Sequence, residues 1–137
     1  MIDRYLLEKM KNIWSQNSKF DYYLRVELAV CNAYRQLGKI PQENYDEIVK
    51  NAKFNLNRID EIEKEVHHDV IAFLTCVNES LGDNAKYMHM GLTSSDVIDT
   101  AYALQIKEAS SIIADDLANL IVTIKQKANQ YKNTVCI

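Results

Sequence analysis

The segment HMGLTSSD, residues 89–96, opens the longest uninterrupted helical pattern in this chain. Thr93 or Ser94 has the side-chain oxygen that a helix N-cap needs, and Asp96 is placed so that its carboxylate can accept from the N–H of Thr93. Gly91 permits a tight backbone approach just before the cap. The segment therefore predicts a helix start where N–H groups, hydroxyls and the positive end of the helix dipole meet, which suits a carboxylate or a phosphate.

The sequence that follows, from Ser95 to about Asn133, predicts one long helix. It contains neither Gly nor Pro, and its apolar residues recur at helical spacing, at Val97, Ala101, Leu104, Ile113, Leu117, Leu120, Ile124, Ala128 and Tyr131. Such a helix is roughly 55 Å long, whereas a compact domain of this size has a radius of gyration of about 14 Å. We therefore expect it to project from its own domain, with its apolar stripe covered by other subunits or by further parts of a longer chain.

The composition favours an all-α fold. The 137 residues are 47% hydrophobic and 26% charged, with a net charge of −3, which is typical of one ordinary soluble domain. Three glycines and one proline provide little material for the turns of β-sandwiches and barrels. Shorter helices are predicted at 1–18, at 19–37 before Gly38, from Pro41 as a first helical residue, and from Asn57 to Leu81 with a bend near His67.

The apolar residues of the predicted helix at 19–37 are expected in the core. They are Phe20, Tyr23, Leu24, Ala29, Val30, Ala33, Tyr34 and Leu37. Cys31, Cys76 and Cys136 are odd in number and lack CxxC spacing, which favours small buried thiols over a disulfide framework or a zinc site.

Several classes of partner are not expected. The sixteen basic residues are scattered along the chain, so no nucleic-acid partner is predicted. No apolar run approaches the roughly eighteen residues of a membrane span, and charged residues interrupt the N-terminus, unlike in a signal peptide. We therefore expect no membrane partner and a cytoplasmic location.

All three histidines fall in two short segments, His67-His68-Asp69 and the segment that begins at His89. A histidine beside a carboxylate is the usual arrangement for a proton donor or acceptor near neutral pH. Adjacent imidazoles on a helix point in different directions, so one would face a site and the other its support or solvent. Histidine pairs also occur on helix surfaces without any chemical role, and no HxxxH or HExxH spacing indicates a metal. The two segments are expected to form two walls of one site.

Arg4 and Tyr5 form a third candidate near the chain start. A guanidinium and a phenol both donate to phosphate oxygens, so this pair could bind an anion. The alternative is a solvated arginine beside a half-buried tyrosine.

Taken together, Arg4-Tyr5, HHDV at 67–70, HMGLTSSDV at 89–97 and the Asp99-Thr100-Ala101 that follows resemble, in order and spacing, the N-terminal part of the adenylosuccinate lyase family. That family lies in the fumarase/aspartase superfamily. The resemblance implies an N-terminal helical domain at 1–93 and, at 94–137, the first long helix of a central helical bundle. It also implies a homotetramer whose active sites take residues from several subunits.

The resemblance further implies a β-elimination in purine biosynthesis. Family members release fumarate from adenylosuccinate to leave AMP, and from the succinylocarboxamide ribotide, with no metal or organic cofactor. Carried over residue by residue, Arg4 and Tyr5 would bind the substrate phosphate, and Thr93 and Ser94 a carboxylate of the succinyl part. His68 would act at the reacting centre.

In the same resemblance His67 and Asp69 would contact the nucleotide, and His89 would take a substrate-binding role. A further catalytic histidine and a serine-bearing loop of the family are not present in these 137 residues. The chain alone is therefore expected to be inactive. Two alternatives stay open: another lyase of the superfamily, and a non-enzymatic helical module that self-associates.

Overall fold

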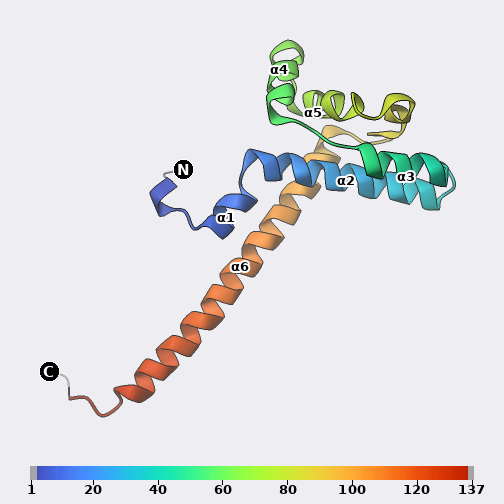
Figure 1. Cartoon of the computed structure of the whole chain (residues 1–137). Helices are drawn as coiled ribbons and strands as arrows, with labels where there is room; N and C mark the ends of the chain where they lie inside the picture. Colours follow the sequence, from blue (N-terminus) through green and yellow to red (C-terminus); the bar gives the residue numbers. More distant parts are fainter. Residues whose placement is uncertain (1–2, 136–137) are drawn as a thin grey trace.

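The computed structural model describes residues 3–135 (Figure 1). Within them no strand is formed, which confirms the predicted all-α fold. Two 3-10 helices and six α-helices follow one another along the chain: η1 (Asp3–Tyr5), α1 (Glu8–Ile13), α2 (Gln16–Gln36), α3 (Gln42–Asn51), α4 (Leu56–Val66), α5 (Asp69–Asn78), η2 (Gly82–Tyr87) and α6 (Ser94–Gln130).

Most of the helices pack around α2. The helices α3 and α6 contact α2, α4 packs on α5, and α1 lies against α6. Figure 1 shows α2 and α3 side by side, α4 and α5 as a second pair, and α6 leading away from this assembly. We call the packed part, from α1 to the beginning of α6, the head.

An aromatic cluster fills the centre of the head. Phe20 of α2 stacks on Phe73 of α5 with ring centroids 5.6 Å apart, and Tyr23 meets Phe73 edge-on at 5.7 Å. Fully buried aliphatic residues from four helices surround it, namely Ile48, Ile59, Val70 and Val97. These residues tie α3, α4, α5 and the start of α6 to α2 through burial of apolar surface.

The predicted core face of α2 is only partly right. Phe20 and Tyr23 are buried, but Ala29, Ala33 and Leu37 are exposed. The helix turns Glu27 and Cys31 inward, so these alanines fall on another side. There Ala29 and Ala33 line an open cavity of about 630 Å³ together with Gly91 and Leu92.

Three helix boundaries differ from the predictions or refine them. Pro41 is the N-cap of α3 rather than its first helical residue. The N-cap of α4 is Asn55, whose side chain accepts from the N–H of Arg58 at 3.2 Å, so the predicted start at Asn57 is wrong by about one half-turn. The predicted bend near His67 is a complete break between α4 and α5.

The long helix begins where predicted and ends at Gln130, about three residues before the predicted end near Asn133. Thr93 is the N-cap of α6, and the carboxylate of Asp96 accepts from the N–H of Thr93 at 2.8 Å. With 37 residues, α6 is roughly 55 Å long and projects from the head as expected (Figure 1). Among residues 3–135, no helix is both long enough and apolar enough to cross a membrane. Cys31 and Cys76 are buried free thiols as predicted, and Cys136 lies outside the described residues.

Candidate functional site

The break between α4 and α5 presents His67, His68 and Asp69. His67 closes α4 in the left-handed conformation, with φ 52, and its N–H donates to the carbonyl of Glu63 at 2.8 Å. His68 is the N-cap of α5, and its Nδ1 accepts from the N–H of Ile71 at 3.4 Å. The sequence predicts both imidazoles on one helix. Instead, neither is part of a continuous helix face. With Nδ1 turned to the backbone, Nε2 is the nitrogen that His68 presents to a ligand.

Asp69 is held on both of its oxygens. Oδ2 lies 3.0 Å from Nζ of Lys19 on α2, and Oδ1 accepts from the N–H of Val70 at 2.8 Å. Oδ1 is also 3.9 Å from Nδ1 of His68. Burial opposes ionisation of Asp69, but the hydrogen bond and charge of Lys19 outweigh it, so that the pKa of Asp69 lies below its usual value.

Lys19 shows the complementary effect. Burial lowers its pKa, but the hydrogen bond from its ammonium to Asp69, together with the charges of Tyr23 and Asp69, raises the pKa above the ordinary value. Both groups of the pair are therefore charged across the physiological range. Sequence reasoning missed Lys19, because the pair joins residues 50 positions apart.

The Lys19–Asp69 pair separates two neighbouring cavities. One, of about 430 Å³, is lined by Gln16, Lys19, Phe20, Asp60, Glu63, His67, His68 and Asp69. The other, of about 560 Å³, shares Gln16, Lys19 and Asp69 with the first and extends to Tyr102 and Gln105 of α6. The structure thus brings the three residues of the His-His-Asp segment together at a polar cavity beside α2.

The remaining candidates lie outside the lining of that cavity. Arg4 and Tyr5 form η1 ahead of α1, with the Arg4 guanidinium 4.9 Å from the centre of the Tyr5 ring. Tyr5 is 71% exposed, so it is not the half-buried tyrosine of the alternative reading. Thr93 is exposed and Ser94 half-buried at the N-terminus of α6. Here the carboxylate of Asp96 accepts from the Thr93 N–H, and the Thr93 side chain in turn accepts from the backbone N–H of Asp96, so the Thr93 hydroxyl keeps its hydrogen for donation.

His89 is paired with a carboxylate that sequence reasoning missed. Glu27 of α2, with 0% of its surface exposed, accepts from the N–H of His89 through Oε2 at 2.9 Å. Its Oε1 lies 2.7 Å from Nδ1 of the same residue. One signal could have indicated Glu27: it interrupts the buried positions Phe20, Tyr23 and Cys31 on one face of α2, and a buried carboxylate needs a partner.

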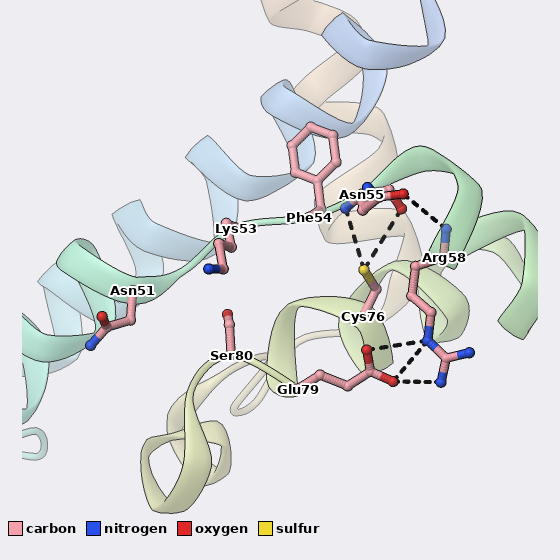
Figure 2. Close-up of a pocket in the computed structure, with 8 residues that line it drawn as sticks. All are labelled: Asn51, Lys53, Phe54, Asn55, Arg58, Cys76, Glu79 and Ser80. Atoms are coloured by element: carbon pink, nitrogen blue, oxygen red, sulfur yellow. Dashed lines mark hydrogen bonds and ion pairs between the residues drawn. The ribbon is translucent and has the colours of Figure 1, made fainter.

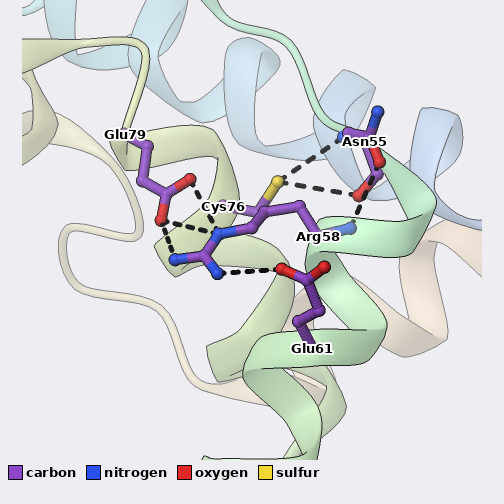
Figure 3. Close-up of polar contacts among 5 residues, drawn as sticks. All are labelled: Asn55, Arg58, Glu61, Cys76 and Glu79. Carbon is purple, nitrogen blue, oxygen red and sulfur yellow. Dashed lines mark hydrogen bonds and ion pairs between the residues drawn. The ribbon is translucent and has the colours of Figure 1, made fainter.

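A further cavity, of about 460 Å³, lies between the α3–α4 linker and α5 (Figure 2). Its polar residues largely bind one another. The Arg58 guanidinium contacts Glu79 at 2.7 Å and Glu61 at 3.0 Å, and Cys76 Sγ lies 3.5 Å from the backbone N of Asn55 (Figure 3). Hydrogen bonding to Arg58, its largest influence, lowers the pKa of Glu79. These contacts fasten the start of α4 to the end of α5, which is a structural role.

The fold is that of a lyase. The solved structure of a fumarate lyase from Mesorhizobium sp. BNC1 superposes with a TM-score of 0.71 and 25% identity, covering 79% of this chain and 26% of that chain. A family model described as Lyase matches residues 6–137, and the chain therefore belongs to this lyase family.

Individual relatives agree with the resemblance found in the sequence motifs. The chain is 51% identical over all of its 137 residues to an adenylosuccinate lyase from Synechocystis sp., of which it covers 32%. It is 45% identical to the adenylosuccinate lyase of Bacillus subtilis over 98% of its own length and 31% of that protein. The predicted family is thus confirmed, and the chain spans about a third of the length of these curated relatives.

Proposed function

We propose that this chain forms part of an adenylosuccinate lyase, which eliminates fumarate from adenylosuccinate to give AMP and from the succinylocarboxamide ribotide in purine biosynthesis. The observation that carries the proposal is the similarity to adenylosuccinate lyases along the entire chain. The polar cavity at the α4–α5 break supports it, because an imidazole, an ammonium and a carboxylate lie together there.

In the reaction, a base removes a proton from the carbon beside a carboxylate of the succinyl part. The electron pair of that C–H bond forms the double bond of fumarate, the C–N bond breaks, and the nitrogen that leaves with AMP gains a proton. His68 acts at this centre through Nε2, since its Nδ1 faces the N–H of Ile71. Residues of the rest of the protein supply the other partner of the proton transfer.

The other candidate residues bind the substrate. Arg4 and Tyr5 hold the phosphate, since the exposed guanidinium and phenol are unobstructed donors. Thr93 and Ser94 hold a carboxylate of the succinyl part at the N-terminus of α6.

His67 and Asp69 contact the nucleotide, and His89 takes part in substrate binding. The cavity of His67, His68 and Asp69 is not lined by His89, Thr93 or Ser94, and the complete site in this proposal includes further protein around it. The reaction uses no metal or organic cofactor in this proposal.

The proposal extends to assembly and location. Residues 1–93 belong to an N-terminal helical domain, and residues 94–137 to a central bundle whose first long helix is α6 (Ser94–Gln130), in a cytoplasmic homotetramer. The large apolar residues of α6 beyond the head support this assembly, because they are exposed in the isolated chain. The 137-residue chain alone is expected to have no lyase activity.

The test is an ultraviolet assay of adenylosuccinate cleavage by the full-length protein that contains this chain. His68 is also a helix cap, so we choose His68→Asn, because asparagine keeps the cap and removes the imidazole. The expected loss in kcat/KM is roughly 10²- to 10⁴-fold. Asn55→Asp is the matched control, because it also exchanges one capping residue for another, at the N-cap of α4 and outside the lining of the His68 cavity, and it should keep the wild-type kcat/KM. Unchanged turnover by His68→Asn would show that His68 takes no part in the reaction.

The exposed stripe of α6 also fits a helical module that only self-associates. In that case alanine substitution of Arg4, His68, Thr93 and Ser94 would leave ligand binding unchanged. Another lyase of the superfamily would instead bind its substrate without competition from AMP, because it would not need the Arg4–Tyr5 phosphate grip. If the protein binds AMP and Arg4→Ala weakens this binding, the adenylosuccinate lyase is supported over both alternatives.

A further inference from the structure

Glu27 is a buried carboxylate whose hydrogen-bond partner within residues 3–135 is His89. It lies on the inward side of α2 with 0% of its surface exposed, and both of its oxygens contact His89. An ionised carboxylate away from water is costly unless it is paired and hydrogen-bonded. The position therefore cannot be explained by packing alone, since an apolar side chain would fill it at lower cost.

The two contacts fix the ring of His89 as well as its backbone. Oε2 accepts from the backbone N–H at 2.9 Å, and Oε1 faces ring Nδ1 at 2.7 Å. An ionised carboxylate only accepts, so when Glu27 is ionised Nδ1 carries the hydrogen of this contact. Nε2 is then the ring nitrogen that is left to meet a ligand. The side chain of His89 is 20% exposed, which leaves part of the ring accessible.

The backbone around His89 is held in an uncommon conformation. His89 has φ 57, in the left-handed region that residues other than glycine rarely adopt. Gly91, with φ 75, lies so close to α2 that a Cβ there would be 2.7 Å from the hydroxyl oxygen of Tyr34. Two residues of α2, Glu27 and Tyr34, thus hold the turn that leads into the N-cap of α6.

We propose that Glu27 is a positioning residue that acts through His89. It holds the imidazole in the state with hydrogen on Nδ1 and directs Nε2 toward a polar group of the nucleotide substrate. This inference rests on the proposed substrate-binding role of His89. Glu27 touches no substrate itself, and its whole effect on the reaction passes through the imidazole.

The decisive experiment is a double-mutant cycle in the full-length protein. Glu27→Gln preserves the shape of the side chain but replaces one accepting oxygen with an amide that donates. We expect kcat/KM for adenylosuccinate to fall about 100-fold, as for other small misplacements of a binding group. In a His89→Ala background, Glu27→Gln should cause no further loss. Equal losses in both backgrounds would show a merely structural role and overturn the proposal.

A core variant of α3 controls for lost stability. Ile48→Ala removes methyl groups from a side chain that is 0% exposed, and it leaves Glu27 and His89 in place. Well below its melting temperature, this variant should retain the wild-type kcat/KM. If Ile48→Ala lowers kcat/KM as much as Glu27→Gln does, the effect of Glu27 is also one of stability, and the positioning role fails.

A measurement on the unmodified protein covers the case in which Glu27→Gln does not fold. The ¹⁵N resonances of the His89 ring report which nitrogen carries hydrogen. We expect a hydrogen on Nδ1, and a bare Nδ1 would overturn the proposal. The ring state does not depend on the reaction. A wild-type protein that fails to cleave adenylosuccinate would therefore overturn the proposed function, whereas a bare Nδ1 would overturn the role of Glu27.

Discussion

The two halves of α6 share one helical pattern but differ in what covers them. In the first half, Val97 and Ala101 are 0% exposed, and Ala109 is also buried. In the second half, Leu117 is 53% and Ile121 65% exposed. Small side chains in the first half let α6 approach α2 closely, whereas the large apolar residues of the second half have no cover within residues 3–135. A single apolar stripe thus serves one interface inside the chain and leaves a second face for other protein.

Introducing a charge tests this difference most strongly. Val97→Asp places an unpaired carboxylate in the core and should lower the free energy of unfolding by about 3–5 kcal/mol. The same change in the second half, Leu117→Asp, should alter it by no more than about 0.5 kcal/mol in the dissociated chain. Urea denaturation followed by circular dichroism measures both. Similar losses for the two variants would mean that the second half is covered as well.

Subunit association, unlike stability, should depend on the second half of α6. Burying a large apolar side chain contributes about 1.5–3 kcal/mol, so each of Leu117→Asp and Ile124→Asp should weaken subunit association about tenfold or more. Sedimentation velocity over a concentration series measures this. Asn119→Asp adds the same charge to an exposed position of α6 without removing apolar surface, and it should associate like the wild type. Unaltered association of the first two variants would exclude this face from the interface.

Replacing one glutamine in each half of α6 should give a smaller difference in stability. Gln105 is buried, and its Nε2 donates to the carbonyl of Ile13 at 2.7 Å, which links α6 to α1. Gln105→Leu leaves that carbonyl without its donor and should cost about 1–3 kcal/mol of stability. Gln126→Leu, at an exposed position of the second half, should change stability by less than about 0.5 kcal/mol. Thermal unfolding of the two variants side by side decides whether the α1 contact matters.

Features that depend on neighbouring residues were predictable from the sequence. The cap at Thr93 needs only a carboxylate one turn later, and the projecting helix follows from length and the absence of Gly and Pro. The start of α4 was misplaced because Asn55 and Asn57 both suit a cap, and it is the Asn55 side chain that accepts from the Arg58 N–H. The break at His67 was foreseen only as a bend, because a histidine rather than a glycine adopts the left-handed conformation there.

The candidate site was less predictable, since its contacts join distant parts of the chain. Glu27 and His89 are 62 positions apart, and Lys19 and Asp69 are 50 apart. Helical periodicity placed α2 in the core and could have indicated Glu27 on the face of Phe20 and Cys31, but it could not indicate which distant residue would be its partner. The sequence therefore indicated which histidines belong to the candidate site. Their segments meet charged partners, Glu27 at His89 and Lys19 at Asp69, only where α2 packs against them.

The smallest effect concerns the Lys19–Asp69 pair, at the cavity that reaches Gln105 in the covered half of α6. The folded-state pKa of Asp69 is lowered, so the pair stabilises the protein fully above the unfolded pKa of about 3.9 and loses this effect as the pH falls through the lower folded value. Both side chains are about one-third exposed, at 35% and 34%, so the contribution should stay below about 1 kcal/mol.

Asp69→Asn should therefore reduce stability equally between pH 5 and 8, and the difference from the wild type should vanish in acid. Urea denaturation of both proteins at pH values from 8 down into acid measures this difference in stability. Asp60→Asn alters another carboxylate, which lines the neighbouring cavity of His67 and His68 but forms no ion pair with a described residue, so it should follow the wild-type curve. Asparagine keeps an oxygen that can accept from the Val70 N–H, as Asp69 Oδ1 does at 2.8 Å, so the substitution removes the charge and not this acceptor. A difference for Asp69→Asn that persists unchanged in acid would therefore show that the charge of Asp69 does not stabilise the contact between α2 and the α4–α5 break.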